Sequence, residues 1–150
     1  MLDTYEISKN TFAIIPIDSN KSEVIEDNGC FIINRNSTKI VDDSCKFFGS
    51  SLSGRHEGTK NLIGVNYKSP IIVEESAEII FFPTNSPRLT DCAWISLNNL
   101  EEYKRINGKT KIAFKNGKTI DVDVSFNSLE NQVLRSTRLE AMLRKRKQNW

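Results

Sequence analysis

Short runs of β-branched and aromatic residues, each ended by Asn, Asp, Gly, Ser or Pro, recur along most of the chain and are typical of β-strands. From residue 127 onward the sequence contains neither Gly nor Pro and is rich in helix formers. This change of pattern predicts an α+β fold, with a mixed, largely antiparallel sheet or barrel-like body and a long basic C-terminal helix. We expect strands at 11–17, 30–34, 38–42, 70–74, 78–82 and 93–97, a helical turn at 98–105, a short helix near 43–57 and the long helix near 127–146.

Length and composition place the chain among single-domain proteins. Its 150 residues, 38% of them apolar, are enough to bury a core, so residues 1–150 are predicted to form one domain. No run of about 18 apolar residues is present, and the first ten residues lack an apolar secretory segment, so neither membrane insertion nor secretion is expected. The three cysteines are odd in number and widely spaced, which favours reduced thiols and a cytoplasmic location.

The clearest local prediction is a β-hairpin over 110–124. A three-residue loop at 115–117 pairs Ile112 with Ile120, whereas a two-residue Asn-Gly turn would set Ile112 against Asp121. The longer loop also places its glycine where a left-handed backbone is needed. The basic tip of this hairpin could enter a DNA groove, although a solvated turn is the more ordinary interpretation.

The predicted C-terminal helix has an apolar side and a basic side. Residues 131–150 carry six basic side chains and one acidic side chain, hence a net charge of +5, whereas the whole chain carries +2. Asn127, with Glu130 three residues later, resembles a capping box. The apolar side, within an arc of about 120°, comprises Leu129, Val133, Leu139 and Leu143. The opposite side presents Asn131, Arg135, Arg138, Met142 and Lys145, which we expect to offer positive charge to a partner.

The segment 44–60, SCKFFGSSLSGRHEGTK, combines several motif-like features. Its glycines are spaced as in a nucleotide-binding P-loop, but Arg55 and His56 stand where that motif needs Lys and then Ser or Thr, so nucleotide hydrolysis is not expected. A catalytic Cys45–His56 pair is disfavoured because the cysteine adjoins two phenylalanines, a setting typical of a buried thiol. The cysteines and the single histidine lack the short paired spacings of a zinc site. We therefore predict no catalysis, no metal and no cofactor.

The same segment is suited to contact the phosphates of a polymer. Its glycines allow close approach of the backbone, and its hydroxyl side chains alternate with basic ones. The alternative is a solvated turn or a helix that packs through its small residues. The candidate binding residues of this segment are Lys46, Ser50, Ser51, Gly54, Arg55, His56 and Lys60.

The motifs of this sequence resemble those of a known family. DDSCKFFGSSLSGRHEGT (42–59) is similar to the signature of the ComK family of competence transcription factors. The likeness continues, in the family's order, through SPIIVE, IIFFPT, CAWISLNNL, FKNGKT and SFNSLENQVLRS, and so spans roughly residues 5–140. It implies a bacterial activator of DNA-uptake genes, located in the cytoplasm at the nucleoid. Better-known members carry a C-terminal tail that an adaptor and a protease recognise; this sequence ends at Trp150, which leaves that control open.

The resemblance also implies a mode of binding. Family members bind double-stranded DNA at paired A-run and T-run boxes, mainly through the minor groove, as dimers that assemble further into tetramers. A-tracts have a narrow, electronegative minor groove that attracts inserted basic side chains, so we expect an exposed Gly54-Arg55-His56 to insert there. Arg135, Arg138 and Lys145 are expected to hold backbone phosphates or a second subunit. The competing hypothesis is a non-catalytic protein-interaction module whose basic helix docks on an acidic partner.

Overall fold

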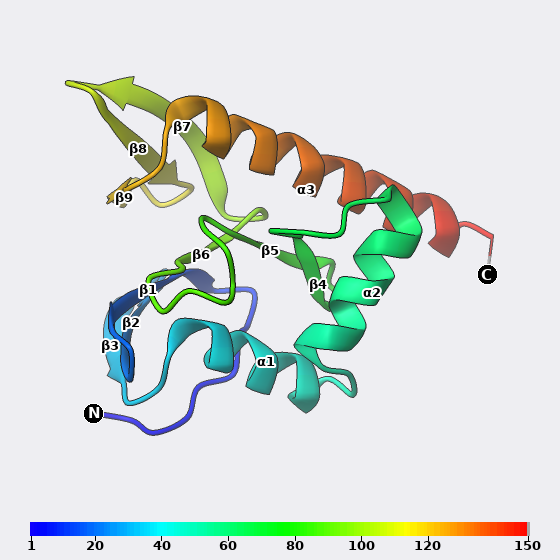
Figure 1. The fold of residues 1–150 in the computed structure, drawn as a ribbon, viewed down its shortest axis with the longest axis horizontal. Coiled ribbons are helices and arrows are strands. Elements are labelled where there is room, and N and C mark those ends of the chain that lie inside the picture. The colour runs from blue at the N-terminus through cyan, green and yellow to red at the C-terminus, as the bar shows by residue number, and fades with distance from the viewer. Residues whose placement is uncertain (150) are drawn as a thin grey trace.

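Two antiparallel β-sheets and three helices make up the fold in the computed structural model, which describes residues 1–149 (Figure 1). The predicted α+β class is confirmed, and the strands form two open sheets instead of a closed barrel. The strands are β1 (Thr11–Asp18), β2 (Lys21–Glu26), β3 (Gly29–Ile33), β4 (Ile71–Glu74), β5 (Ile79–Pro83), β6 (Trp94–Ser96), β7 (Leu100–Ile106), β8 (Lys109–Phe114) and β9 (Thr119–Val122). The helices are α1 (Ser37–Phe47), α2 (Leu52–Ile63) and α3 (Phe126–Lys147).

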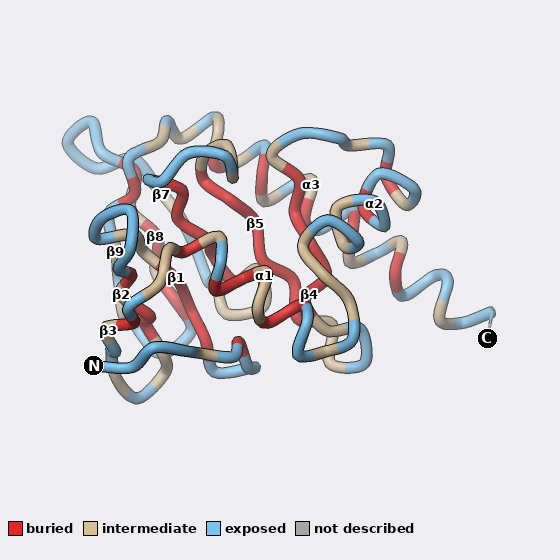
Figure 2. Tube along the Cα trace, turned by 60° about the horizontal axis from the view of Figure 1, so that its bottom comes forward, coloured by how far each residue is buried: buried red, intermediate tan, exposed pale blue. Residues whose placement is uncertain are grey.

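A six-stranded sheet of order β3-β2-β1-β6-β5-β4 forms the centre of the molecule. The tubes of β4 and β5 are mostly red, hence buried, in Figure 2, and so is the first half of β1. On one face, Ile14, Phe81 and Trp94 pack with Ile40 and Cys45 of α1 in a single core cluster. Helix α1 therefore covers this face.

The other face of the same sheet is covered by the second sheet and by the two remaining helices. Phe82 lies next to Phe81 in β5 but points to the opposite side, as alternation along a strand requires. It packs with Phe114 of the three-stranded sheet β7-β8-β9 and with Leu129 of α3. Further along, Ile80 packs with residues of α2 and α3, including Leu139. Helix α3 thus links two parts of the core.

The segment 38–42, expected to be a strand, lies instead in helix α1. Ile40, Val41, Ser44 and Cys45 recur at helical spacing and are all buried, so one stripe of α1 faces the sheet. Asn36 caps the helix, because its side chain accepts a hydrogen bond from Thr38 N–H at 3.0 Å. This spacing and cap outweigh the strand preference of the β-branched residues.

The single short helix expected near 43–57 is two helices separated by a tight corner. Gly49 has a φ of 89°, a left-handed conformation that interrupts the helix after Phe48. Ser51 then caps α2, accepting a hydrogen bond from Gly54 N–H at 2.9 Å. Asp42 of α1 accepts another from Leu52 N–H at 2.9 Å, which fixes the start of α2 against α1.

Two strands were not predicted as such. Strand β2 was not predicted at all, and 98–105, expected to be a helical turn, contains most of β7. The sequence of β7, LEEYKRI, is largely charged and its residues are mostly exposed, so no apolar alternation marks it as a strand. Pairing with β8 supplies the hydrogen bonds that define it.

The hairpin at 110–124 and the C-terminal helix are confirmed. Ile112 pairs with Ile120, residues 115–117 form the loop, and Gly117 has a φ of 89°. Helix α3 matches the prediction to within a residue at either end, but its cap is Ser125, whose side chain accepts from Ser128 N–H, instead of Asn127. No helix in residues 1–149 is long and apolar enough to cross a membrane.

Candidate nucleic-acid interface

Arg55, the residue expected to reach into a groove, points into the protein surface. Its side chain is only 16% exposed, and its Nη1 donates to Glu75 Oε1 at 2.8 Å. Its Nε is buried and has no partner in the described part of the chain. The expected exposure of Arg55 is therefore wrong, because a carboxylate in the β4–β5 turn binds the guanidinium.

His56 lies on a different side of α2 from Arg55. Successive residues of an α-helix are about 100° apart, so the two side chains diverge. His56 lines a cleft together with Trp94 and Tyr67, whereas Arg55 lines a separate hollow beside Glu75. The segment Gly54-Arg55-His56 therefore does not present both side chains to one groove.

The remaining candidates of this segment lie at or near the α1–α2 corner, except Lys60, which is in the last turn of α2. Lys46 is exposed, and its ammonium lies 3.0 Å from Asp42. Ser51 is used as the cap of α2, whereas Gly54 and Lys60 lie on the exposed part of that helix. Ser50 is half-buried and its Oγ would lie 2.8 Å from a Cβ added at Gly54, so little room remains there for a larger residue. The exposed cations of this segment are therefore Lys46, which is paired with Asp42 at the corner, and Lys60, at the far end of α2.

The basic side of α3 is only partly free. Arg138 and Lys145 are exposed, and in residues 1–149 neither side chain is in an ion pair or a hydrogen bond. Arg135 is half-buried, because its Nη1 donates to Gln132 Oε1 at 3.1 Å and its guanidinium lies 5.2 Å from the ring centre of Tyr67. Arg138 and Lys145 can therefore contact an external anion directly.

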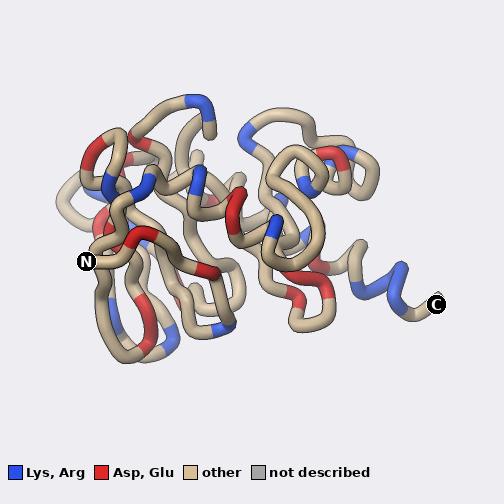
Figure 3. Tube along the Cα trace, turned by 90° about the horizontal axis from the view of Figure 1, so that it is seen from below, with Lys and Arg blue, Asp and Glu red and all other residues tan. Residues whose placement is uncertain are grey.

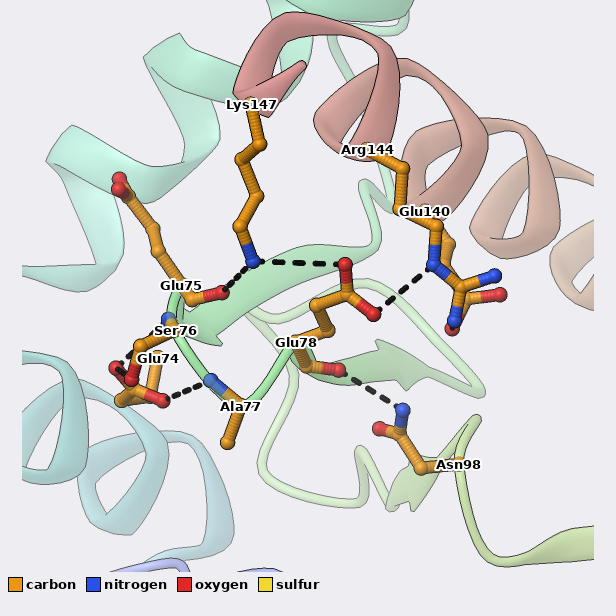
Figure 4. A network of polar contacts seen from close by, with 9 residues as sticks. All are labelled: Glu74, Glu75, Ser76, Ala77, Glu78, Asn98, Glu140, Arg144 and Lys147. Atoms are coloured by element: carbon orange, nitrogen blue, oxygen red, sulfur yellow. Dashed lines mark hydrogen bonds and ion pairs between the residues drawn. The ribbon is translucent and has the colours of Figure 1, made fainter. Parts of the chain in front are cut away.

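Glu78 binds two other basic residues of α3 (Figure 4). Arg144 Nε donates to Glu78 Oε1 at 2.9 Å, and Lys147 Nζ lies 3.5 Å from Glu78 Oε2 and donates to Glu75 O at 3.0 Å. Asn98 in turn donates to the carbonyl oxygen of Glu78 at 2.8 Å. Basic residues gather along the last turns of α3 in Figure 3, but part of their charge is already balanced by the protein itself.

The hairpin formed by β7 and β8 is the functional candidate that sequence reasoning missed. It forms one extremity of the molecule, at the upper left of Figure 1. Its turn consists of Asn107 and Gly108, with φ of 52° and 77°. Arg105 and Lys109 flank the turn, are exposed, and form no ion pair in the described chain. The Asn-Gly pair between two short runs is a strong hairpin signal and could have revealed this element.

The β7–β8 hairpin is free, whereas the loop at 115–117 is held against the body. Lys118 Nζ donates to Glu26 O at 2.7 Å, and Asn116 Nδ2 donates to Asp27 O at 2.9 Å. The Lys118 ammonium is thus used within the protein. Of the two hairpin tips, the one at Asn107-Gly108 is the better placed to meet a large partner.

The cysteines do not form a reactive centre. Burial raises the pKa of the Cys45 thiol to about 12 and that of Cys92 to about 11, so both stay protonated near neutral pH. Cys45 belongs to the core under α1, which confirms the interpretation of a buried structural thiol. Cys30 lies exposed on the edge strand β3.

Comparison with known proteins identifies the family. The model of the ComK protein family matches residues 2–148. The competence transcription factor of Bacillus subtilis (strain 168) is 40% identical over 149 residues, a match that covers 97% of this chain and 78% of that protein. No solved structure gives a significant match. The chain therefore belongs to the ComK family, as its motifs predicted.

Proposed function

We propose that the chain is a transcriptional activator of competence genes that binds A/T-rich DNA, mainly through the minor groove. The observation that carries this proposal is the β7–β8 hairpin, which forms an exposed extremity of the molecule. Its tip carries basic side chains that form no ion pair in the described chain, and its turn consists of two small residues. A two-residue turn is narrow enough to approach a groove edge, and its glycine adds no side chain there. We place its site of action in the cytoplasm, at the nucleoid.

Arg105 is the residue we assign to the groove. A-tract minor grooves are narrow and strongly negative, and a guanidinium is weakly hydrated enough to enter them. Ile106, 37% exposed beside it, can touch the groove wall, and Lys109 on the opposite strand can reach a phosphate. This arrangement would favour A·T pairs without a helix in the major groove.

A second contact region lies at the other end of α3. The helix has 22 residues and is therefore about 33 Å long, close to the 34 Å of one turn of B-DNA. The ring of Tyr103 of β7 packs against that of Phe126, with centres 5.4 Å apart and planes tilted by 39°, so the hairpin is anchored at the first turn of α3. We assign to backbone phosphates Arg138 and Lys145, which lie about 18 Å and about 28 Å along the helix axis from Phe126.

The α1–α2 corner adds weaker contacts in this proposal. Lys46 and Lys60 are exposed cations, and Gly58 leaves the backbone of α2 uncovered on an exposed side, whereas the hydroxyl groups of Ser50 and Ser51 fill the space beside Gly54. Such a surface can approach a phosphate closely. We also propose that two copies of the protein bind one pair of boxes, because each of two repeated half-sites can be contacted by one subunit of a dimer. Dimers would then assemble into larger complexes on tandem sites.

The test is a binding assay with an A-run/T-run duplex and a scrambled duplex of equal composition. The wild type should prefer the A-run duplex, and Arg105→Ala should weaken that binding by about tenfold or more and reduce the preference. Arg105→Lys should keep most of the salt dependence but lose part of the preference. Mass photometry of the same complexes counts the copies bound.

Lys21→Ala is the matched control, because Lys21 is also an exposed cation at a hairpin turn, between β1 and β2. It should leave binding unchanged. Equal binding of Arg105→Ala and wild type would contradict the assignment of the hairpin. Failure of the wild type to bind either duplex, combined with tight binding to an acidic protein, would favour the interaction-module hypothesis instead.

A further inference from the structure

A cleft of about 690 Å³ opens between α1, α2 and the two loops that flank strands β4 and β6. Its size is typical of a small-molecule site, since such pockets span about 300–1,000 Å³. None of the contacts assigned to the hairpin or to α3 lies in it. The cleft is therefore a separate feature of the molecule.

The floor of the cleft is apolar and aromatic. It includes the buried Trp94 and Ile71, with Leu52 and Pro87 on its sides. The indole of Trp94 is held in place because its Nε1 donates to Thr38 Oγ1 at 3.1 Å. Because Trp94 is itself fully buried, a flat apolar group in the cleft would pack on the partly exposed Leu52 and Pro87 above it.

The rim carries positive charge that the protein does not balance. Lys39, Lys68 and Arg88 come from three different segments, and within residues 1–149 none of them forms an ion pair. The one acidic residue of the cleft is Asp42, whose Oδ1 accepts from Leu52 N–H at 2.9 Å and whose Oδ2 lies 3.0 Å from Lys46. Asp42 is thus committed to the α1–α2 corner.

An unpartnered hydroxyl group lies in the same cleft. Ser69 is only 3% exposed, and its Oγ is buried without a hydrogen-bond partner in the described chain. A buried hydroxyl normally has a partner, since leaving it without one costs about 1–3 kcal/mol. An oxygen-rich ligand would supply the missing bond.

We propose that this cleft binds a small aromatic molecule that carries a phosphate group. The aromatic part would pack on Leu52 and Pro87, above the buried Trp94, and the phosphate would be held by the ammonium and guanidinium groups of the rim. Three unpaired cations favour a dianion over a neutral or singly charged ligand. The site joins α1 and α2 to both loops, so its occupation would stabilise the folded protein by mass action.

The experiment titrates the full chain with phenyl phosphate, an aromatic dianion, and follows binding by calorimetry. Inorganic phosphate and phenol are the two partial probes, and each should bind at least about tenfold more weakly than phenyl phosphate. In a Trp150→Phe background, Trp94 is the remaining tryptophan, so a saturable change in its fluorescence locates the ligand at the floor.

Two exposed rim residues supply variants that should fold normally. Lys39→Ala and Arg88→Ala should each weaken phenyl phosphate binding by about tenfold, the loss of one charge-assisted contact. Lys21→Ala, outside the cleft, should change nothing. If neither rim variant weakens binding, the site is wrong.

A DNA arm separates this proposal from the proposed function. The same rim variants are tested on the A-run duplex, and they should bind it as the wild type does. If they lose DNA affinity while phenyl phosphate gives no saturable binding to the wild type, the proposal is overturned and the rim belongs to the DNA surface. Binding of phenyl phosphate would stand even if the hairpin assignment failed.

Discussion

At the residue scale, ion pairs within the protein decide which basic side chains are available to a partner. Arg55 and Arg144 each contact a glutamate of the β4–β5 turn, whereas Arg105, Arg138 and Lys145 contact none in the described chain. The sequence contains all of these cations, but Glu75, which binds Arg55, and Glu78, which binds Arg144, lie 20 and 66 residues away along the chain. Arg144 also pairs with Glu140, one helical turn away. No local pattern predicts the two long-range pairs. The sequence could therefore identify the candidate basic residues, but not which of them remain without an ion pair inside the protein.

The first prediction concerns Arg55. We expect Arg55→Ala to lower the free energy of unfolding by at most about 1 kcal/mol, because the pair is formed with a half-exposed Glu75 carboxylate. The preference for the A-run duplex should remain. Urea unfolding and the duplex assay measure the two effects, and the double variant Arg55→Ala/Glu75→Gln shows whether they are coupled. A loss of preference in a stably folded Arg55→Ala would restore Arg55 as a groove residue.

The second prediction concerns pH and Glu74. Burial raises the pKa of this carboxyl, but hydrogen bonds from Ser76 and Ala77 outweigh it, so the pKa lies below its ordinary value of 4.5 (Figure 4). A lowered folded-state pKa gives stability that is present above pH 4.5 and is lost as pH falls through the folded value.

Glu74→Gln should therefore be less stable than wild type at pH 7, and the difference should shrink steadily below pH 4.5. Unfolding in urea at a series of pH values measures it. Glu101→Gln is the control, since Glu101 is exposed and its side chain has no hydrogen bond among residues 1–149. A difference that persists unchanged at pH 3 would mean that Glu74 acts through packing.

At the element scale, local signals predicted the elements whose structure is set locally. The hairpin at 110–124 and helix α3 follow from alternation, a turn glycine and an unbroken run of helix formers. Part of helix α1 was predicted as a strand because Ile40 and Val41 are adjacent β-branched residues. The packing of Ile40, Val41 and Cys45 on the sheet shows that the helical spacing of the buried residues outweighs this strand preference. Strand β7 was missed because its charged side chains face solvent on both sides, so its pairing with β8 has no apolar signature.

The third prediction contrasts two glycines of α2. A Cβ added at Gly58 meets no atom within 4 Å, so Gly58→Ala should stabilise the protein by about 0.5–1 kcal/mol through helix propensity. Gly64 ends the helix with a φ of 75°, so Gly64→Ala should destabilise it by about 1 kcal/mol or more. Thermal unfolding measures both changes.

Gly58→Ala also tests the proposed contact between the exposed side of α2 and DNA. If the bare backbone of α2 approaches phosphates, Gly58→Ala should weaken DNA binding although it stabilises the fold. Unchanged DNA affinity in this variant would remove this side of α2 from the proposed surface. A destabilised Gly58→Ala would contradict the open space beside Gly58.

At the scale of the whole molecule, α3 acts as a rigid spacer. Its first turn anchors the β7–β8 hairpin through Phe126, and its last turns are fastened to the β4–β5 turn through Glu78 (Figures 1 and 4). The hairpin and the cations of α3 that are assigned to DNA are therefore held in a fixed relative position by a helix about 33 Å long.

The fourth prediction follows from the distal contact region. Lys145→Ala should weaken binding to A-run and scrambled duplexes about equally and should reduce the slope of log affinity against log salt by about 0.9. Fluorescence anisotropy across a salt series measures it, with Lys21→Ala as the control. If Lys145→Ala keeps the slope but lowers the number of copies bound, the C-terminal end of α3 belongs to the subunit contact.

The distribution of the three thiols has a practical consequence. Cys30 lies open on the outermost strand, while Cys45 and Cys92 are sealed in the interior with suppressed reactivity. An alkylating dye added to the unaltered protein near neutral pH would attach at a single position. Cys45 and Cys92 would react with the dye only when the core opens. The rate at which these two thiols are labelled would therefore measure the rate at which the core opens.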